Sequence, residues 1–156
     1  MIIHPDLRGL LEEHPFFEGL PGDVLETVAG CASNVRFDVG QRIAREGESA
    51  DAIYLLRRGR VALELRIHHA PVVVKTLGPG ELLGFNWLFE DHRWHYDVRA
   101  VEVTRAVALD GACLRRKCEA DHSLGFELLR RFAQGIEEEL YRTRLQLVDV
   151  YGPAGG

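Results

Sequence analysis

The sequence predicts a mainly β domain, a barrel or jelly roll of short strands, with helices before and after it. Between Ser33 and Asp110, short runs alternate apolar and polar residues, which is the period of a β-strand. Glycines separate these runs at the intervals expected of an all-β barrel, at positions 40, 47, 59, 80 and 84. On both sides of this region apolar residues recur every three or four positions, which is typical of one helix face.

The chain is expected to form one domain with four segments. They are an N-terminal helical segment, the barrel, C-terminal helices and a disordered tail, at residues 1–32, 33–110, 111–150 and 151–156. In the first segment, a short amphipathic helix from Asp6 to Glu13 ends at Pro15. Pro21 then opens a second helix over Gly22–Gly30, since proline suits a helix start. The tail is rich in glycine and cannot pack.

One hairpin stands out within the barrel. Every second residue is apolar over residues 61–67, and a second apolar run follows at Val72–Val74. This pattern predicts two paired strands with His68–Pro71 as the turn. His68 and His69 are expected at a solvated tip, because adjacent residues there point to opposite sides and do not suit a metal site.

Two C-terminal helices are predicted, over Ala112–Asp121 and His122–Val150. The second is apolar along one side for more than four turns, which is more apolar surface than a small barrel covers. We therefore expect a homodimer through this helix, with burial against its own barrel as the alternative. The predicted dimerisation residues are Leu128, Leu129, Phe132, Ile136, Leu140 and Leu147.

Composition excludes several classes of protein. The 156 residues are 46% hydrophobic and 28% charged, as in folded globular domains. A net charge of −5 disfavours direct DNA binding, which needs basic side chains to neutralise phosphates. There is no signal-peptide pattern, and apolar runs such as Pro71–Val74 are too short to cross a bilayer. A cytoplasmic location without membrane attachment is the resulting expectation.

The three cysteines are expected to be reduced, because an odd number argues against a disulfide framework. Cys113 and Cys118 lie five residues apart on one predicted helix and point away from each other. With Cys31 they match no iron–sulfur spacing.

The sequence does not predict an enzyme. It has no nucleophile elbow, no paired-histidine zinc motif and no phosphate-binding loop ending in lysine. Glu137–Glu139 resemble a carboxylate cluster, but three neighbours on a helix radiate outward and are expected to form a solvated face.

Several segments together resemble the cyclic nucleotide-binding domains. They are His14–Leu20, Val35–Ile43, Arg45–Leu55, Gly59–Val61, Leu77–Gly84, Val98–Ala100 and Leu109–Asp110. The similarity covers residues 14–150 and includes glycine turns, strand alternation and terminal helices. It implies an eight-stranded jelly roll followed by a long helix, and a regulatory role in signal transduction. Members of the family include bacterial transcription regulators, kinase regulatory subunits and gated channels.

The resemblance weakens at the phosphate-binding cassette. In the family, a glutamate binds the ribose hydroxyl and an arginine pairs with the cyclic phosphate. Here Gly84 is kept, but the glutamate position holds Phe85 and the arginine position holds Trp94. Replacing charges with rings removes the groups that select a sugar phosphate. The predicted ligand-binding residues are Leu83, Gly84, Phe85, Asn86, Trp87, Arg93, Trp94, His95 and Tyr96.

The leading hypothesis is a stand-alone regulatory module that does not bind cyclic AMP in the usual way. One alternative is a true cyclic nucleotide receptor that uses backbone amides and Arg93. Strand alternation and the nearby charges of Glu90 and Asp91 argue against this alternative. Another is an adaptor for a protein partner, with a pocket filled by its own rings. The last is a sensor of haem, through His92 or His95, or of another apolar ligand.

No cofactor is predicted beyond a cyclic nucleotide or another small ligand. Regulators of this family continue past the long helix into a helix-turn-helix. The sequence given ends six residues after Val150, so we expect no direct DNA binding.

Overall fold

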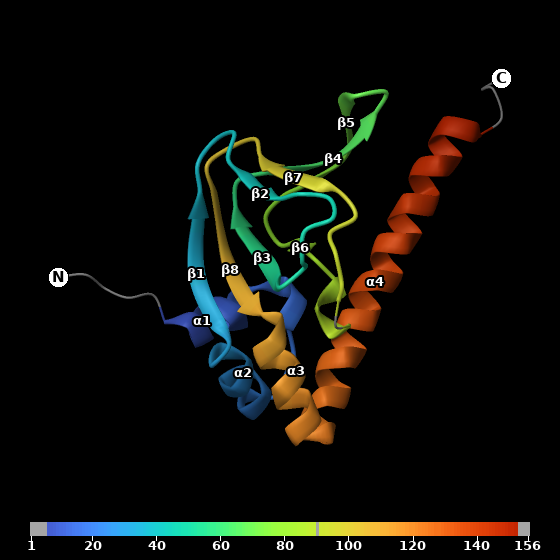
Figure 1. Ribbon diagram of the computed structural model, residues 1–156. Coiled ribbons are helices and arrows are strands. Elements are labelled where there is room, and N and C mark those ends of the chain that lie inside the picture. Colours follow the sequence, from blue (N-terminus) through green and yellow to red (C-terminus); the bar gives the residue numbers. More distant parts are fainter. Residues whose placement is uncertain (1–5, 90, 153–156) are drawn as a thin grey trace.

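The computed structural model describes residues 6–89 and 91–152 and shows two facing β-sheets, with the shorter α-helices at one end and the long C-terminal helix rising from that end beside the sheets (Figure 1). The strands are β1 Ala32–Phe37, β2 Arg42–Ala44, β3 Ala52–Arg58, β4 Val61–Ile67, β5 Ala70–Leu77, β6 Leu82–Leu83, β7 Asp97–Ala100 and β8 Thr104–Asp110. Two antiparallel sheets result, in the orders β1-β8-β3-β6 and β2-β7-β4-β5. The predicted eight-stranded jelly roll is confirmed.

Four α-helices and two 3₁₀ turns complete the described part of the chain. They are α1 Leu7–Glu13, η1 Pro15–Phe17, α2 Gly22–Ala29, η2 Asn86–Leu88, α3 Gly111–Ala120 and α4 His122–Tyr151. Asp121 separates the last two helices, because its side chain accepts a hydrogen bond from the Leu124 amide and caps α4. The predicted tail lies outside the described residues from position 153 onward, and Tyr151 still belongs to α4.

The strands bury side chains on both of their faces. On β8, Ala106 packs between the two sheets, whereas Val107 and Leu109 pack against the helices. The first core fills the barrel and the second joins the sheet β1-β8-β3-β6 to α1, α2, α3 and α4. This alternation is the period of two that the sequence displays.

The turn of the β4–β5 hairpin is tighter than predicted. β5 begins at Ala70, so the turn consists of His68 and His69 alone, with φ of 51° and 66°. A two-residue turn with positive φ at both positions matches the right-handed twist of the strands it joins. Proline therefore stands inside the strand, opposite Arg66, and not in the turn.

α4 is half packed and half exposed. Leu128 and Phe132 are buried in the core that the helix shares with the barrel, so these two predicted dimerisation residues contact their own chain. Leu129 packs partly against the same core. Beyond this point the helix leaves the helical end of the barrel (Figure 1), and Ile136, Leu140 and Leu147 are exposed. No helix in residues 6–89 and 91–152 combines the length and apolarity needed to cross a membrane.

The expectation of reduced cysteines is wrong for Cys31 and Cys113, which form a disulfide. Ala32 pairs with Leu109 in the register of β1 and β8, so the residue before β1 lies beside the end of β8. The Asp110 amide donates to the Cys31 carbonyl at 3.0 Å, and Cys113 follows within the first turn of α3. Their Cα atoms are 5.7 Å apart, within disulfide range. Cys118 is free and partly buried.

Candidate functional site

A small cavity lies between the barrel and α4. Its volume is about 80 Å³, and it is lined by Leu63, Leu77, Leu82, Leu83, Gly84, Phe85, Asn86, Trp94, Tyr96 and Glu139. Six of the predicted ligand-binding residues therefore meet at one place, although β6, the segment after it and the segment before β7 supply them. Pockets that enclose small ligands usually measure about 300–1,000 Å³, so most of this space is already filled by side chains.

The ring of Trp94 fills the cavity from one side. Trp94 is 6% exposed and belongs to the barrel core. Its backbone is fixed on both sides, since its amide donates to the Glu48 carbonyl and its carbonyl accepts from the Gly47 amide, both at 2.9 Å. The side chain at the position that the sequence resemblance assigns to the family arginine is thus an uncharged ring packed into the barrel.

Gly84 packs directly against the Trp94 ring. Its φ of +100° is unfavourable for any residue with a side chain. A Cβ atom here would also lie 3.3 Å from Cη2 of Trp94 and 3.2 Å from the Ala52 carbonyl oxygen. Both the backbone and the close approach of the tryptophan require glycine at this position.

Three predicted ligand residues lie outside the cavity. Arg93 is exposed, and its guanidinium donates to the Gly47 carbonyl at 2.7 Å. His95 is exposed and stacks edge-on against His92 and Tyr96. Trp87 is fully buried among the helices, with its ring 5.0 Å from that of Phe132.

The loop histidines form a small cluster of their own. Burial of the ring, and then the neighbouring His95, lower the pKa of His92. Neither histidine lines the cavity. Among the residues that the structure describes, no group of three or more histidine, cysteine, aspartate or glutamate side chains is arranged to hold a metal. Glu90, expected to repel a phosphate, lies outside the described residues.

The segment after β6 contains a 3₁₀ turn, Asn86–Leu88. Phe85 caps this turn without a side-chain hydrogen bond, and the Asn86 amide group donates weakly to the Arg93 carbonyl at 3.4 Å. Since the helix dipole depends on several aligned peptides, one short turn offers little positive potential to a phosphate.

Charged groups from α4 border the cavity, and sequence reasoning missed them. Glu139 was expected on a solvated face, but it lines the cavity and forms an ion pair with Lys75 of β5. Burial, and then the Glu139 carboxylate, raise the pKa of Tyr96. Arg142 lies 3.8 Å from Glu81 and 4.0 Å from Glu139. The cations at this border are therefore already paired with carboxylates.

α4 also touches the cassette through a glycine. A Cβ on Gly135 would lie 3.1 Å from Cε1 of Phe85 and 3.0 Å from Cε2 of Phe16. The helix backbone thus lies directly against the Phe85 ring. No sequence signal identifies this contact, because Phe85 and Gly135 are fifty positions apart.

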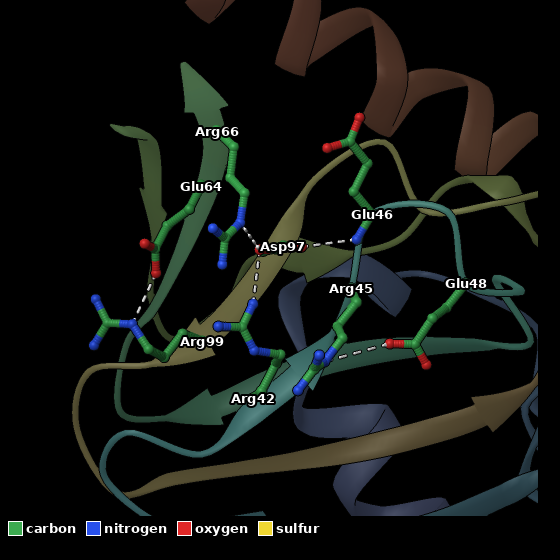
Figure 2. Close-up of polar contacts among 8 residues, drawn as sticks. All are labelled: Arg42, Arg45, Glu46, Glu48, Glu64, Arg66, Asp97 and Arg99. Atoms are coloured by element: carbon green, nitrogen blue, oxygen red, sulfur yellow. Dashed lines mark hydrogen bonds and ion pairs between the residues drawn. The ribbon is translucent and has the colours of Figure 1, made fainter. Parts of the chain in front are cut away.

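A charged network holds the strand that follows Trp94 (Figure 2). At its centre, Asp97 accepts from the Arg42 guanidinium at 2.7 Å and from the Glu46 amide at 2.9 Å, and Arg66 lies 3.9 Å away. The Glu46 amide and the Arg42 guanidinium lower the pKa of Asp97, although burial opposes them. These contacts anchor β7 to its neighbours and fix the backbone that leads to Trp94.

Comparison with known proteins decides the family. Residues 34–121, more than half of the chain, match the model of the cyclic nucleotide-binding domain. The chain belongs to this family. Human cGMP-dependent protein kinase 2 is 31% identical over 139 residues, which are 86% of this chain and 18% of the kinase. The chain therefore spans less than a fifth of that relative and shares with it the cyclic nucleotide-binding domain.

Solved structures agree with this cyclic nucleotide-binding domain assignment. A protein from Geobacter metallireducens GS-15, named as a cyclic nucleotide-binding protein, is 27% identical, with a TM-score of 0.75 over 89% of this chain and 99% of the other. The regulatory subunit of a cAMP-independent protein kinase A from Trypanosoma cruzi, bound to guanosine, is 25% identical, with a TM-score of 0.64 over 90% and 51%.

Proposed function

We propose that this cyclic nucleotide-binding domain is a non-catalytic regulatory module that does not recognise a cyclic phosphate. The observation that carries this proposal is the buried ring of Trp94 at the arginine position, beside a cavity whose nearest charged group is the Glu139 carboxylate. A cyclic phosphate placed there would lose its hydration and meet no unpaired cation among the described lining residues. Arg93 is bonded to the Gly47 carbonyl instead.

The ligand class that fits best is a flat, uncharged molecule of nucleoside type. Phe85 and Tyr96 offer aromatic faces, and Glu139 offers a carboxylate that accepts from N–H groups. The Watson–Crick edge of guanine carries such donors. The relative from Trypanosoma cruzi that is bound to guanosine supports this choice. A cavity of about 80 Å³ holds no nucleoside, so binding requires the Trp94 ring to move.

The same geometry favours a second candidate, an adaptor whose cavity stays closed. Only the small cavity volume argues for it. In this case the barrel serves as a rigid support for a protein partner, and no small molecule alters it.

Titration calorimetry with guanosine, adenosine, cGMP and cAMP separates these functions. We expect guanosine to bind more tightly than cGMP, because the phosphate adds charge without a partner. Tighter binding of cGMP or cAMP than of the parent nucleoside would refute the proposal and favour a cyclic nucleotide receptor in which Arg93 binds the phosphate. If none of the four compounds binds and tryptophan fluorescence stays unchanged, the adaptor is favoured over the nucleoside receptor.

Two variants sharpen the comparison. The double variant F85E/W94R introduces the glutamate and arginine that the resemblance implies. It should gain cyclic nucleotide binding if the lack of these two charges is what prevents binding in the wild type. Glu139→Gln should weaken guanosine binding, whereas Glu137→Gln, on the exposed surface of the same helix, serves as the matched control.

We also propose that the exposed half of α4 pairs with a second copy. Residues 133, 136, 140, 143, 147 and 150 follow steps of three and four, which is the heptad spacing of a coiled coil. Ile136, Leu140, Leu147 and Val150 in this series are 46–72% exposed. A dimer that buries these residues would place the α4 helices of two domains side by side.

A further inference from the structure

A row of arginines crosses the sheet β1-β8-β3-β6, away from the cavity. Arg36 of β1 is paired with Arg105 of β8, and Arg105 is paired with Arg58 of β3. Residues opposite each other on antiparallel strands project from the same face, with Cα atoms about 4.5–5.5 Å apart. Three guanidinium groups therefore leave one face of the sheet within about 10 Å, although like charges in opposite positions destabilise a sheet.

Most of this positive charge has no counterpart in the fold. Arg36 pairs with Asp38 at 2.6 Å. Within residues 6–89 and 91–152, no carboxylate pairs with the guanidinium of Arg58, of Arg105 or of the neighbouring Arg57. In a chain with a net charge of −5, an unneutralised arginine row is a local exception.

A surface groove of about 440 Å³ adjoins the row. It is lined by Leu10, Glu13, His14, Pro15, Leu56, Arg57, Arg58, Pro79 and Gly80, and it shares no lining residue with the cavity at Trp94. The groove therefore combines two guanidinium groups with an apolar floor and wall.

His14 forms a fixed wall of this groove and is not free to bind a ligand by its ring nitrogens. Its Nδ1 accepts from the Phe16 amide at 3.2 Å, so Nε2 carries the proton that it donates to the Leu56 carbonyl at 3.1 Å. Burial lowers the pKa of His14, and the charge of Arg57 lowers it further. The neutral ring thus leaves Arg57 and Arg58 as the cationic groups of the groove, with Glu13 as its acidic residue.

We propose that Arg58, Arg105 and the adjoining groove bind an acidic segment of a partner protein. Aspartate or glutamate side chains would face the arginine row, and an apolar side chain would enter the groove beside Leu10 and Pro79. Arginine is enriched at protein interfaces, where its planar group binds carboxylates in a bidentate manner.

Other polyanions fit the surface less well. A row of about 10 Å is short for a nucleic acid or a bilayer, whose binding needs many dispersed basic contacts. Glu13 in the groove repels any anion, so the carboxylates of the partner are placed at Arg58 and Arg105 and only its apolar side chain enters the groove, whose apolar residues offer phosphates nothing. A carboxylate-bearing peptide with an apolar residue uses both kinds of surface.

Fluorescence anisotropy with a labelled peptide tests the proposal. The probe is a twelve-residue peptide of glutamates around two leucines, and its glutamine counterpart is the reference. We expect R58E/R105E to weaken binding of the acidic peptide at least tenfold. Arg116→Glu, which reverses an exposed charge on α3, should change the dissociation constant less than twofold. Added salt should weaken binding to the wild type.

The neutral variant R58Q/R105Q shows whether a loss of binding in R58E/R105E comes from the arginine charges or from misfolding. We expect this variant to lose peptide binding while its melting temperature rises, because repulsion within the row is removed. The proposal fails if the acidic peptide binds no better than its glutamine counterpart, or if Arg116→Glu weakens binding as much. It also fails if a twenty-nucleotide single strand or a phosphatidylserine vesicle binds these arginines more tightly than the peptide does.

Discussion

Replacing Trp94 with alanine tests whether its ring fills the cavity as structural core. Substituting a buried tryptophan with alanine costs about 3–5 kcal/mol, and the cost grows with the hole that remains. Here the hole joins an existing cavity of about 80 Å³, and Gly84 cannot move into it from its fixed conformation. We therefore expect a loss of about 4 kcal/mol, which lowers the melting temperature by about 8–16 °C in a chain of this size.

Urea denaturation followed by circular dichroism measures this loss for Trp94→Ala. Phe89→Ala is the matched control, because that cassette ring is 60% exposed and its removal should change little. Indole should fill the new hole and restore about 2.7 kcal/mol at a concentration one hundred times its dissociation constant. A loss below about 1 kcal/mol, or equal stabilisation of the wild type by indole, would refute the packing argument.

Three further predictions concern the charged network, the disulfide and α4. The lowered pKa of Asp97 means that its contacts stabilise the fold above the ordinary carboxyl pKa and are lost as pH falls through the lowered value. Asp97→Asn should thus cost about 1–3 kcal/mol at pH 7 and progressively less as pH falls below the ordinary carboxyl pKa, measured by urea titration; a cost that does not change with pH would contradict this. Cys113→Ser should lower the free energy of unfolding by about 4 kcal/mol, because the disulfide to Cys31 links residues 82 positions apart and restricts the unfolded chain. Dithiothreitol should lower the melting temperature of the wild type but not of this variant. Leu147→Glu should convert a dimer to a monomer in sedimentation velocity with the fold intact, and a wild-type monomer would exclude the α4 pairing.

The fold was predictable because its signals are local. Alternation along each strand, glycines at the turns and the three-to-four step of α4 can all be read within short windows. Even the division of the C-terminal helices at Asp121 follows from one capping side chain. The hairpin turn was misjudged because Pro71 suggested a longer loop, whereas the two preceding histidines adopt positive φ.

Contacts between distant segments were not predictable in the same way. Cys31 meets Cys113 only because β1 pairs with β8, and Glu139 is drawn from solvent only because Lys75 lies opposite. Helical periodicity gave the apolar side of α4, but only the three-dimensional packing separates buried Phe132 from exposed Leu147. Sequence separation does not reveal which of these residues share a surface.

We expect the cavity and α4 to be coupled, because Phe85 both lines the cavity and lies against the helix. Trp94 and Phe85 line the same cavity, so a ligand that displaces Trp94 is expected to meet Phe85, whose ring lies against Gly135 of α4. If opening costs the order of the Trp94 packing energy, about 3–5 kcal/mol, the apparent affinity of any ligand falls by about 10²–10³-fold or more. Enlarging the cavity by Trp94→Ala should therefore tighten guanosine binding while it weakens the fold. If Trp94 instead contacted the ligand in an open pocket, its removal would weaken both the fold and guanosine binding.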